Sequence, residues 1–293
     1  MEKIKIRKAI IPVAGFGTRF LPATKAQPKE MLALVDKPVI QYLVEEAVAS
    51  GIEEIIFITG RGKRAIEDHF DHSFELEYNL VEKGRHNLLE EIRKISKLAK
   101  FSYVRQSLPL GDGDAILRAK NLTNGEPFAV LFGDDIVDSK IPCLKQLITV
   151  FEKYRDPVVA LEKVSKKEVV NYGVVSSIKI GEKLNEIKDM VEKPSVKDAP
   201  SDLIIIGKYI LTSDIFNYLE ALGQGSATNE IRLINGLKLM LAARPVYGCE
   251  FEGKRYDCGS KLEFLKAQVE FGLKHKEIKK EFRKYIRELF EEN

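Results

Sequence analysis

The sequence predicts an α/β fold built on a doubly wound, mostly parallel sheet. Short apolar stretches alternate with stretches in which apolar residues recur at helical spacing, and this alternation is typical of β-α-β units. In such a sheet, ligands bind beyond the carboxyl ends of the strands. The loops that follow predicted strands are therefore the first places to look for function.

Composition and charge exclude several classes of protein. The chain of 293 residues is long enough to bury a full core. Its 47 Lys and Arg against 44 Asp and Glu are interspersed, so neither nucleic acid nor a membrane surface is indicated as a partner. No apolar run is long enough to span a membrane. Three widely spaced cysteines and the absence of an apolar signal segment lead us to expect a reducing, cytoplasmic setting.

The loop after the first predicted strand, at 9–13, has the composition of a phosphate-binding loop. Residues 14–19 read A-G-F-G-T-R, and the two glycines can bring backbone N–H groups against an anion without a Cβ in the way. Arg19 and Lys29 can neutralise a polyphosphate from two sides. The loop lacks the third glycine of the dinucleotide fingerprint and the Gly-Lys-Ser/Thr of Walker A. On its own, the fragment fits a solvated glycine turn equally well.

Strands and helices alternate regularly in the first half of the chain. Further strands are expected at 54–59, 101–106, 127–132 and 157–162, and helices at 38–51, from about 64, at 87–98, at 115–120 and at 142–154. Pro38 suits the first turn of the first helix, and Gly51 can end it. A variable polar stretch at 71–84 separates two of the helices.

From about residue 172 the predicted strands become shorter, which indicates a second lobe continuous with the first sheet. Its expected strands are 173–178, 187–191, 203–211 and 245–250, and its helices are 213–221, 230–243 and 261–290. Four apolar residues of the last helix recur along one stripe: Ile278, Phe282, Ile286 and Phe290. The stripe either packs on the body or forms a subunit contact.

An aspartate pair, Asp134 and Asp135, follows Gly133 at the end of the predicted strand 127–132. At least one carboxylate should project into the crevice at the carboxyl end of the sheet. Mg²⁺ is usually bound by one or two carboxylates together with substrate oxygens. Taken alone, the pair also fits a turn or a helix cap.

A longer pattern extends the phosphate loop. Residues 15–31 read G-x-G-T-R-x-x-P-A-T-x-x-x-P-K-E-M, and V-D-K-P follows at 35–38. This pattern resembles the signature of the sugar-1-phosphate nucleotidylyltransferases, and most closely their bacterial branch that uses UTP and glucose 1-phosphate. Later blocks match the same family in the same order, so the resemblance covers roughly residues 7–275.

The resemblance implies a Rossmann-like nucleotidyltransferase fold and a Mg²⁺-dependent transfer of UMP from UTP to glucose 1-phosphate, which yields UDP-glucose and pyrophosphate. It implies one domain, with a nucleotide-binding part at about 1–170, a sugar-binding part at about 171–260 and C-terminal helices at 261–293. The enzymes it resembles lead us to expect a homodimer or homotetramer whose partners are UTP and a sugar 1-phosphate.

Individual roles also follow from the resemblance. Arg19, Lys29 and Lys193 would serve catalysis, and Asp134 and Asp257 would bind the metal. Nucleotide binding would fall to Ala14, Gly15, Gly17, Thr18, Gln106 and Gly111, and sugar binding to Gly173, Glu192 and Lys193. Gln106 offers a donor and an acceptor to the uracil edge, and Gly111 permits close approach of the base. Pro194 favours an extended backbone at Lys193, which would place the Glu192 and Lys193 side chains on opposite sides of a strand end.

The sequence departs from the family pattern at two segments, and both leave the substrates open. Residues 111–115 read G-D-G-D-A where the family has G-L-G-H-A. Asp114 could cap the next helix, and Asp112 could turn towards the ribose or the solvent, which leaves dTTP as an alternative to UTP.

In the second segment, Arg232 and Asn235 replace a glutamine and an aspartate. The change makes this segment more positive, so another sugar 1-phosphate, such as that of a uronic acid, is an alternative if Arg232 faces the sugar; otherwise Arg232 points into solvent. A regulatory protein that binds nucleotide sugars without catalysis is a further alternative. Such a protein could lose the metal carboxylates and the leaving-group cations without penalty, so the presence of Arg19, Lys29, Asp134 and Lys193 argues against it.

Overall fold

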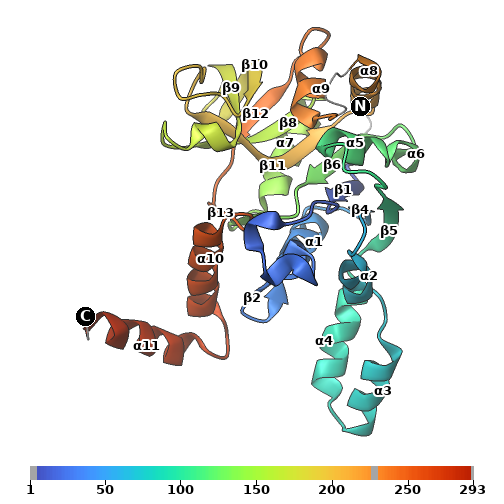
Figure 1. The fold of residues 1–293 in the computed structure, drawn as a ribbon, viewed down its shortest axis with the longest axis vertical. Helices are drawn as coiled ribbons and strands as arrows, with labels where there is room; N and C mark the ends of the chain where they lie inside the picture. The colour runs from blue at the N-terminus through green and yellow to red at the C-terminus, as the bar shows by residue number, and fades with distance from the viewer. Residues whose placement is uncertain (1–4, 226–229, 292–293) are drawn as a thin grey trace.

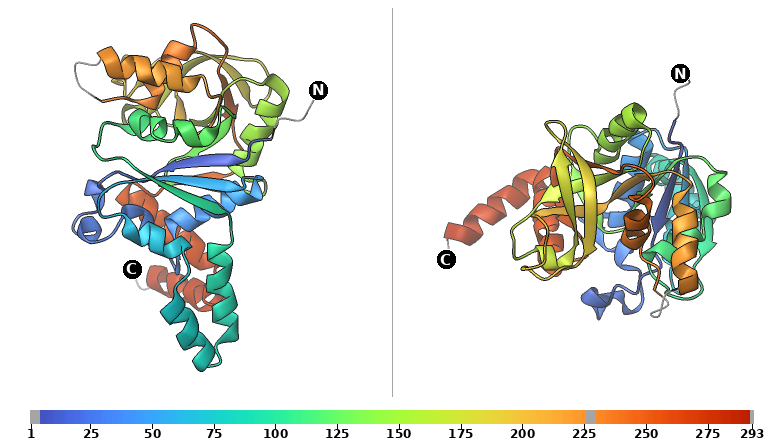
Figure 2. Two further views of the ribbon diagram at one scale, coloured as in Figure 1. Left: turned by 90° about the vertical axis from the view of Figure 1, so that its right-hand side faces the viewer. Right: turned by 90° about the horizontal axis from the view of Figure 1, so that it is seen from above.

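One nine-stranded sheet runs through the protein, with helices packed on its faces (Figure 1, Figure 2). The computed structural model describes residues 5–225 and 230–291. The strand order is β5-β4-β1-β6-β11-β8-β12-β10-β9. The predicted α/β class is confirmed, although the sheet is mixed and not mostly parallel. The expected strand at 54–59 is found without a shift as β4.

The first four strands of this order pair in parallel and form the half that carries the phosphate loop. They are β5 (Lys100–Arg105), β4 (Glu54–Thr59), β1 (Lys8–Pro12) and β6 (Phe128–Leu131). Their helices are α1 (Val39–Ala49), α2 (Arg64–Phe70), α3 (Phe74–Glu82), α4 (His86–Ser96), α5 (Asp112–Leu117), α6 (Lys120–Thr123) and α7 (Cys143–Tyr154). Parallel pairing places the loops after β1, β5 and β6 at one edge of the sheet, as predicted.

The second half of the sheet pairs mostly antiparallel. Strand β11 (Leu203–Leu211) is antiparallel to both β6 and β8 (Val158–Lys163), and it joins the two halves. Beyond β8 lie β12 (Tyr247–Glu250), β10 (Leu184–Glu192) and β9 (Gly173–Lys179). Helices α8 (Ile215–Gly225) and α9 (Leu233–Met240) complete this lobe, which lies at the top in Figure 1.

Within the described residues, two small sheets and four short 3₁₀ helices lie outside the main sheet. β7 (Asp135–Asp138) pairs with β13 (Lys254–Asp257), and β2 (Ala33–Leu34) pairs with β3 (Lys37–Pro38). The 3₁₀ helices are η1 (Thr18–Phe20), η2 (Ala23–Lys25), η3 (Lys29–Met31) and η4 (Val169–Asn171). The sequence did not predict the β7–β13 pair, which sets Asp257 directly opposite Asp135.

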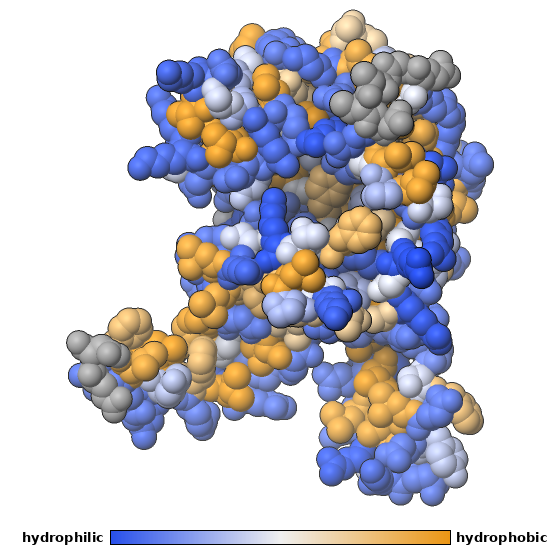
Figure 3. Space-filling model, in the orientation of Figure 1, coloured by the Kyte–Doolittle hydropathy of each residue, from blue (hydrophilic) through white to orange (hydrophobic). Residues whose placement is uncertain are grey.

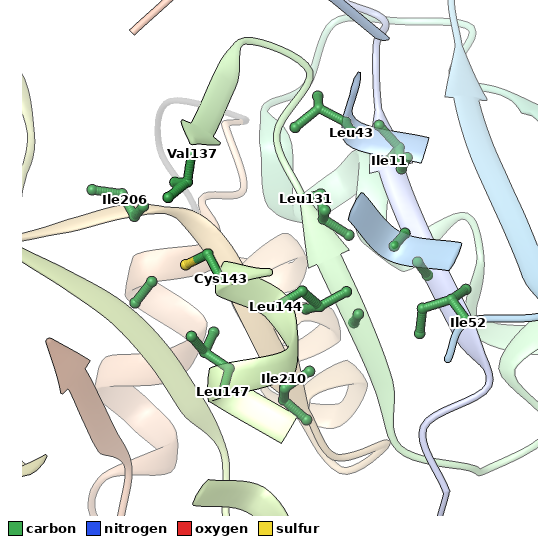
Figure 4. Close-up of a cluster of buried hydrophobic side chains, with 14 of the residues drawn as sticks. Ile11, Leu43, Ile52, Leu131, Val137, Cys143, Leu144, Leu147, Ile206 and Ile210 are labelled. Atoms are coloured by element: carbon green, nitrogen blue, oxygen red, sulfur yellow. The ribbon is translucent and has the colours of Figure 1, made fainter. Parts of the chain in front are cut away.

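A continuous apolar core fixes the parallel strands against the helices on one face. Ile11 of β1 and Leu131 of β6 lie in this cluster with Leu43 of α1 and Leu144 of α7 (Figure 4). All four side chains are fully buried, and a buried aliphatic side chain of this size contributes roughly 1.5–3 kcal/mol. The core therefore holds β1 and β6 side by side and fixes the positions of the loops that leave them.

The stretch at 71–84 contains a helix that the sequence did not predict. α3 buries none of its side chains, and it pairs with α4 in a hairpin that projects from the body (Figure 1). Glu77 of α3 accepts a hydrogen bond from Arg93 of α4 at 2.6 Å. Because α3 buries no apolar stripe against the body, the sequence has no clear helical pattern of apolar residues from which this helix could be predicted.

The C-terminal stretch forms two helices instead of one, α10 (Lys261–Lys274) and α11 (Lys279–Glu291). The break follows His275, whose backbone is extended and whose ring binds Asp36 at 2.9 Å. No described residue of α11 is buried, but the Phe282 ring lies against Gly272 of α10, so the stripe packs partly on the neighbouring helix, and a subunit contact stays a prediction. Among the residues placed in the structure, no helix has the length and hydropathy needed to cross a membrane.

Candidate active site

The loops after β1, β5 and β6 enclose a cavity of about 530 Å³. Ten of the predicted site residues line it: Ala14, Gly15, Gly17, Thr18, Arg19, Lys29, Gln106, Gly111, Asp134 and Lys193. The face shown in Figure 3 is hollowed between the upper lobe and the phosphate loop. The structure therefore gathers at one place residues that are up to 179 positions apart, from Ala14 to Lys193.

The phosphate loop is shaped by Gly17, whose φ is +66°. A Cβ at this position would lie 3.0 Å from the Cβ of Lys29 and 3.4 Å from a methyl carbon of Thr24. The Thr24 hydroxyl also donates a hydrogen bond to the Gly17 carbonyl at 2.8 Å. Gly17 thus lets the loop pack directly on the segment that carries Lys29, as only glycine adopts such a φ at low cost.

Gln106 also lines this cavity, and part of its amide is already engaged within the protein. Its Nε2 donates to the Gly111 carbonyl at 2.9 Å and to Asp114 Oδ2 at 2.8 Å. Both amide hydrogens are used, so only Oε1 is available to a base. Asp114 does not cap the following helix, because its carboxylate is turned towards Gln106 and Arg118.

Gly111 is required by the close approach of a second loop. Its φ is +101°, and a Cβ there would lie 2.3 Å from the carbonyl oxygen of Ile231. Ile231 also donates its N–H to Leu110 and accepts a hydrogen bond from Gly113. The base end of the cavity is therefore joined by backbone hydrogen bonds to the segment that precedes α9.

Asp134 and Asp257 converge on Gly259 from two segments of chain. A Cβ on Gly259 would lie 2.5 Å from Asp134 Oδ2 and 2.9 Å from Asp257 Oδ1. Lys29 Nζ pairs with Asp134 Oδ2 at 2.5 Å. Within the described ranges, no three or more His, Cys, Asp or Glu side chains gather as a metal site. Two converging carboxylates fit a divalent ion that takes its remaining ligands from phosphates and water.

Burial and neighbouring charge act in opposite directions on these groups. Burial alone would raise the pKa of Asp134, but Lys29 and then Arg255 and Arg19 outweigh it and lower that pKa. Burial and the charge of Asp135 raise the pKa of Asp257, although Arg255 opposes them. The pKa of Lys29 is raised, since Asp134 and Glu30 outweigh its burial. Lys29 and Asp134 therefore stabilise each other's charged forms.

Three residues that the sequence reasoning missed support Asp257 and Asp134. The Tyr172 hydroxyl donates to Asp257 Oδ2 at 2.9 Å, and burial raises the pKa of this tyrosine to about 12. Arg255 is 7% exposed and binds Asp135 at 2.5 Å, with Asp257 at 3.7 Å. The third residue is Gly259, whose N–H donates to Asp257 Oδ1 at 2.9 Å, a local turn that an aspartate two positions before a glycine favours. Tyr172 adjoins the predicted Gly173 and Arg255 lies two positions before Asp257, but no local signal marks the contacts of these two residues.

A second cavity of about 220 Å³ adjoins the first on the side of the antiparallel lobe. The predicted residues Gly173, Glu192, Lys193 and Asp257 line it. The expectation of an extended Lys193 was wrong, because its φ is +44° and its N–H binds the Tyr172 carbonyl at 3.0 Å. This turn lets the side chains of Glu192 and Lys193 reach the same cavity, and Lys193 Nζ lies 3.8 Å from Glu192 Oε1.

The two departures from the family pattern have structural roles. Asp112 accepts a hydrogen bond from the N–H of Leu233 at 2.9 Å, so it is turned towards the start of α9 and not towards solvent. Arg232 binds Glu192 Oε1 at 2.8 Å and Glu230 Oε2 at 2.9 Å. It precedes α9 and lines neither cavity in the described part of the chain, so it neither faces the sugar space nor points freely into solvent. Asn235 also lines neither.

Comparison with known protein families identifies the family to which this chain belongs. A family model described as nucleotidyl transferase matches residues 8–272. The chain belongs to this family. Curated nucleotidyl transferase relatives include a UTP–glucose-1-phosphate uridylyltransferase of Bacillus subtilis (strain 168), 49% identical over 97% of this chain and 96% of that protein. One from Staphylococcus haemolyticus is 50% identical over 97% of this chain and 99% of its own.

Solved nucleotidyl transferase structures agree with this assignment. A UDP-glucose pyrophosphorylase complexed with UDP-glucose is 44% identical, with a TM-score of 0.84 over 92% of this chain and all of that one. A UTP-bound enzyme from Acinetobacter baumannii is 38% identical, with a TM-score of 0.90 over 97% of this chain and all of its own.

Proposed function

We propose that the protein transfers UMP from UTP to glucose 1-phosphate and releases pyrophosphate. The observation that carries this proposal is that the linings of the two cavities share the charged residues Arg19, Asp112, Asp134 and Lys193. A nucleotide in the larger cavity and a sugar phosphate in the smaller one would therefore bring their phosphates together at two cations and the metal carboxylate Asp134, while Asp112 is turned towards the start of α9. The similarity to uridylyltransferases that act on glucose 1-phosphate supports the choice of substrates.

The larger cavity would hold UTP along its length. The uracil would lie against Gln106 and Gly111, near the backbone of Ala14 and Gly15. Gly17 and Thr18 would cradle the triphosphate, and Arg19 and Lys29 would neutralise it and the leaving pyrophosphate. Because so much negative charge gathers there, positioning and electrostatic stabilisation supply most of the rate enhancement.

Asp134 and Asp257 would hold Mg²⁺. Enzymes of this family typically use a divalent metal, and the two carboxylates converging over Gly259 fit a hard cation that keeps phosphate and water ligands. When bound, Mg²⁺ neutralises negative charge on the phosphates. Tyr172 and Arg255 would hold Asp257 in place through the contacts described above.

The smaller cavity would hold glucose 1-phosphate. Glu192 would accept hydrogen bonds from sugar hydroxyls, the backbone at Gly173 would contact the sugar, and Lys193 would bind its phosphate. An oxygen of that phosphate would attack the α-phosphorus of UTP while the bond to pyrophosphate breaks on the opposite side. This direct displacement yields UDP-glucose without a covalent enzyme intermediate.

We propose one domain for the whole chain, because a single sheet crosses both cavities. Ile278 and Phe290, at the two ends of the C-terminal apolar stripe, are exposed, which is consistent with the expected homodimer or homotetramer. Light scattering of the purified protein measures that state.

The test of the proposed function is a substrate panel. Four nucleoside triphosphates are each combined with several sugar 1-phosphates, including glucose and glucuronate 1-phosphates, and pyrophosphate release is measured with and without Mg²⁺. We expect the highest specificity constant for UTP with glucose 1-phosphate. A higher value for another pair would replace these substrates, and the absence of turnover with every pair would favour a binding protein.

A further inference from the structure

The amide of Gln106 is held in one orientation by the protein itself. The side chain is buried, and Nε2 donates to two oxygens, the Gly111 carbonyl and Asp114 Oδ2. Neither oxygen can donate in return. A flipped amide would place Oε1 against both of them and lose two hydrogen bonds, at a cost well above thermal energy in a buried site.

Asp114 is held in its turn by Arg118, one helical turn further along. Arg118 NH2 binds Asp114 Oδ1 at 2.7 Å, and Arg118 Nε lies 3.4 Å from Oδ2. Asp114 is only 2% exposed, whereas the Arg118 side chain is 44% exposed. A carboxylate this deeply buried needs such a partner, because an unpaired buried charge is strongly unfavourable. Arg118, Asp114 and Gln106 thus form a chain of contacts that ends at the nucleotide cavity.

The free Oε1 of Gln106 can only accept. No described residue donates a hydrogen bond to it, and Gln106 lines the same cavity as Ala14 and Gly111. Uracil and thymine carry an N–H at N3, whereas cytosine carries an unprotonated acceptor nitrogen there. An acceptor fixed at this place matches the first two bases and repels the third.

We propose that Asp114 and Arg118 are positioning residues that fix the amide of Gln106 and make the base site selective for a pyrimidine with an N3–H over cytosine. This inference rests on the proposed use of UTP. It assigns a role to Asp114, the second aspartate of the G-D-G-D-A segment at 111–115. Neither residue touches the nucleotide cavity directly, so both act through Gln106.

The test compares binding of UTP and of CTP by calorimetry, with Mg²⁺ and without sugar phosphate. The parent should bind UTP at least about tenfold more tightly than CTP, since one mismatched buried hydrogen bond has roughly this effect. Asp114→Ala should reduce that ratio to about threefold or less, and Asp114→Asn, which keeps an acceptor, should retain more of it. Arg118→Ala should lower the ratio in the same direction, and it should also lower the melting temperature, because it leaves the buried Asp114 carboxylate without its ion-pair partner.

A double-mutant cycle separates positioning from general damage. Gln106→Ala should also reduce the ratio, and adding Asp114→Ala to it should change the ratio no further. Glu220→Ala, which removes a carboxylate from an exposed ion pair with Lys120 on a neighbouring helix, should leave the ratio as in the parent.

The outcomes are distinct. A parent that binds both nucleotides equally overturns the inference, and so does an unchanged ratio in both the Asp114→Ala and Arg118→Ala proteins. If Asp114→Ala does not fold, Arg118→Ala alone decides. Selective UTP binding without turnover of glucose 1-phosphate would overturn the proposed function and leave the inference standing.

Discussion

The nucleotide cavity and the sugar cavity are built in different ways. The first is framed by loops after parallel strands, where glycines such as Gly17 and Gly111 bring backbone close to its contents. The second is framed by the ends of antiparallel strands, where the partly exposed side chain of Glu192 lines the cavity and is held by an ion pair with Arg232 outside it. Nucleotide recognition therefore depends on backbone geometry, whereas sugar recognition depends on charged side chains that water can screen.

This difference predicts which substitutions affect both substrates and which affect one. The metal carboxylates, which lie where the two cavities meet, should affect the reaction as a whole. Residues on the sugar side should affect the sugar phosphate selectively, and those held by exposed ion pairs should have the smallest effects.

The largest effect is expected at the junction, for Asp134→Ala. The substitution removes one of the two converging carboxylates and leaves the phosphates poorly screened, so turnover should fall roughly a hundredfold to a thousandfold. Pyrophosphate release at saturating Mg²⁺ measures it. The matched control is Asp138→Ala at the far end of β7, where the carboxylate pairs with Lys274 near the surface. Residual activity of Asp134→Ala within about tenfold of the parent, about 1.4 kcal/mol of barrier, would contradict the metal assignment.

A smaller and more selective effect is expected for Lys193→Ala. Loss of the cation should lower the specificity constant for the sugar phosphate by roughly tenfold to a hundredfold. Calorimetric titration should show that UTP affinity survives, since this residue is supplied by the antiparallel lobe. Equal losses of UTP affinity and sugar-phosphate affinity would show that the two cavities do not bind their substrates independently.

The backbone of Lys193 supplies a companion experiment. Its φ of +44° is unfavourable for any residue with a Cβ. Lys193→Gly should therefore be more stable than Lys193→Ala by about 1 kcal/mol in denaturant unfolding, while both lose the same activity. Equal stability of the two variants would mean that this turn carries no strain.

Gly259→Ala should weaken Mg²⁺ binding without lowering the stability of the fold. The new Cβ would lie within 3 Å of both Asp134 Oδ2 and Asp257 Oδ1, which are the movable ends of side chains. The melting temperature should therefore change little, whereas the Mg²⁺ concentration for half-maximal activity should rise roughly tenfold. Gly181→Ala is the control, because its Cβ would meet only Leu184 at 3.3 Å. An unchanged Mg²⁺ requirement would show that the two carboxylates do not share an ion.

The sequence predicted the nucleotide cavity better than the sugar cavity, because the two cavities are built from different kinds of segment. Most groups of the first belong to loops that follow buried strands, and apolar stretches and glycines mark such loops locally. The β7–β13 pair joins segments about 120 positions apart, as between Asp135 and Arg255, and nothing local specifies that pairing. The support of Asp257 by Tyr172 and Arg255 could not be predicted for this reason.

Local rules also failed where tertiary contacts outweighed them. The residue before Pro194 is expected to be extended, yet Lys193 turns because its N–H binds Tyr172 at a strand end. Aspartate is a residue type that often caps helices, but the Asp114 carboxylate binds Gln106 and Arg118 instead of a backbone N–H. In both cases the competing partner lies in the active site, where function and local preference most often conflict.

The smallest effect is expected for Arg232→Gln. Arg232 braces Glu192 from outside the sugar cavity and is itself one-third exposed, so its contribution is that of a screened ion pair, up to about 1 kcal/mol. The Michaelis constant for glucose 1-phosphate should rise roughly threefold, because Glu192 becomes less well ordered. The preference for glucose over glucuronate 1-phosphate should not change, since the guanidinium does not reach the sugar space. Specificity constants for both sugar phosphates measure this, with Lys238→Gln, which breaks an exposed pair with Asp189, as the control. A shift of about fivefold towards glucose, which corresponds to about 1 kcal/mol, would instead mean that Arg232 turns into the cavity when a sugar is bound.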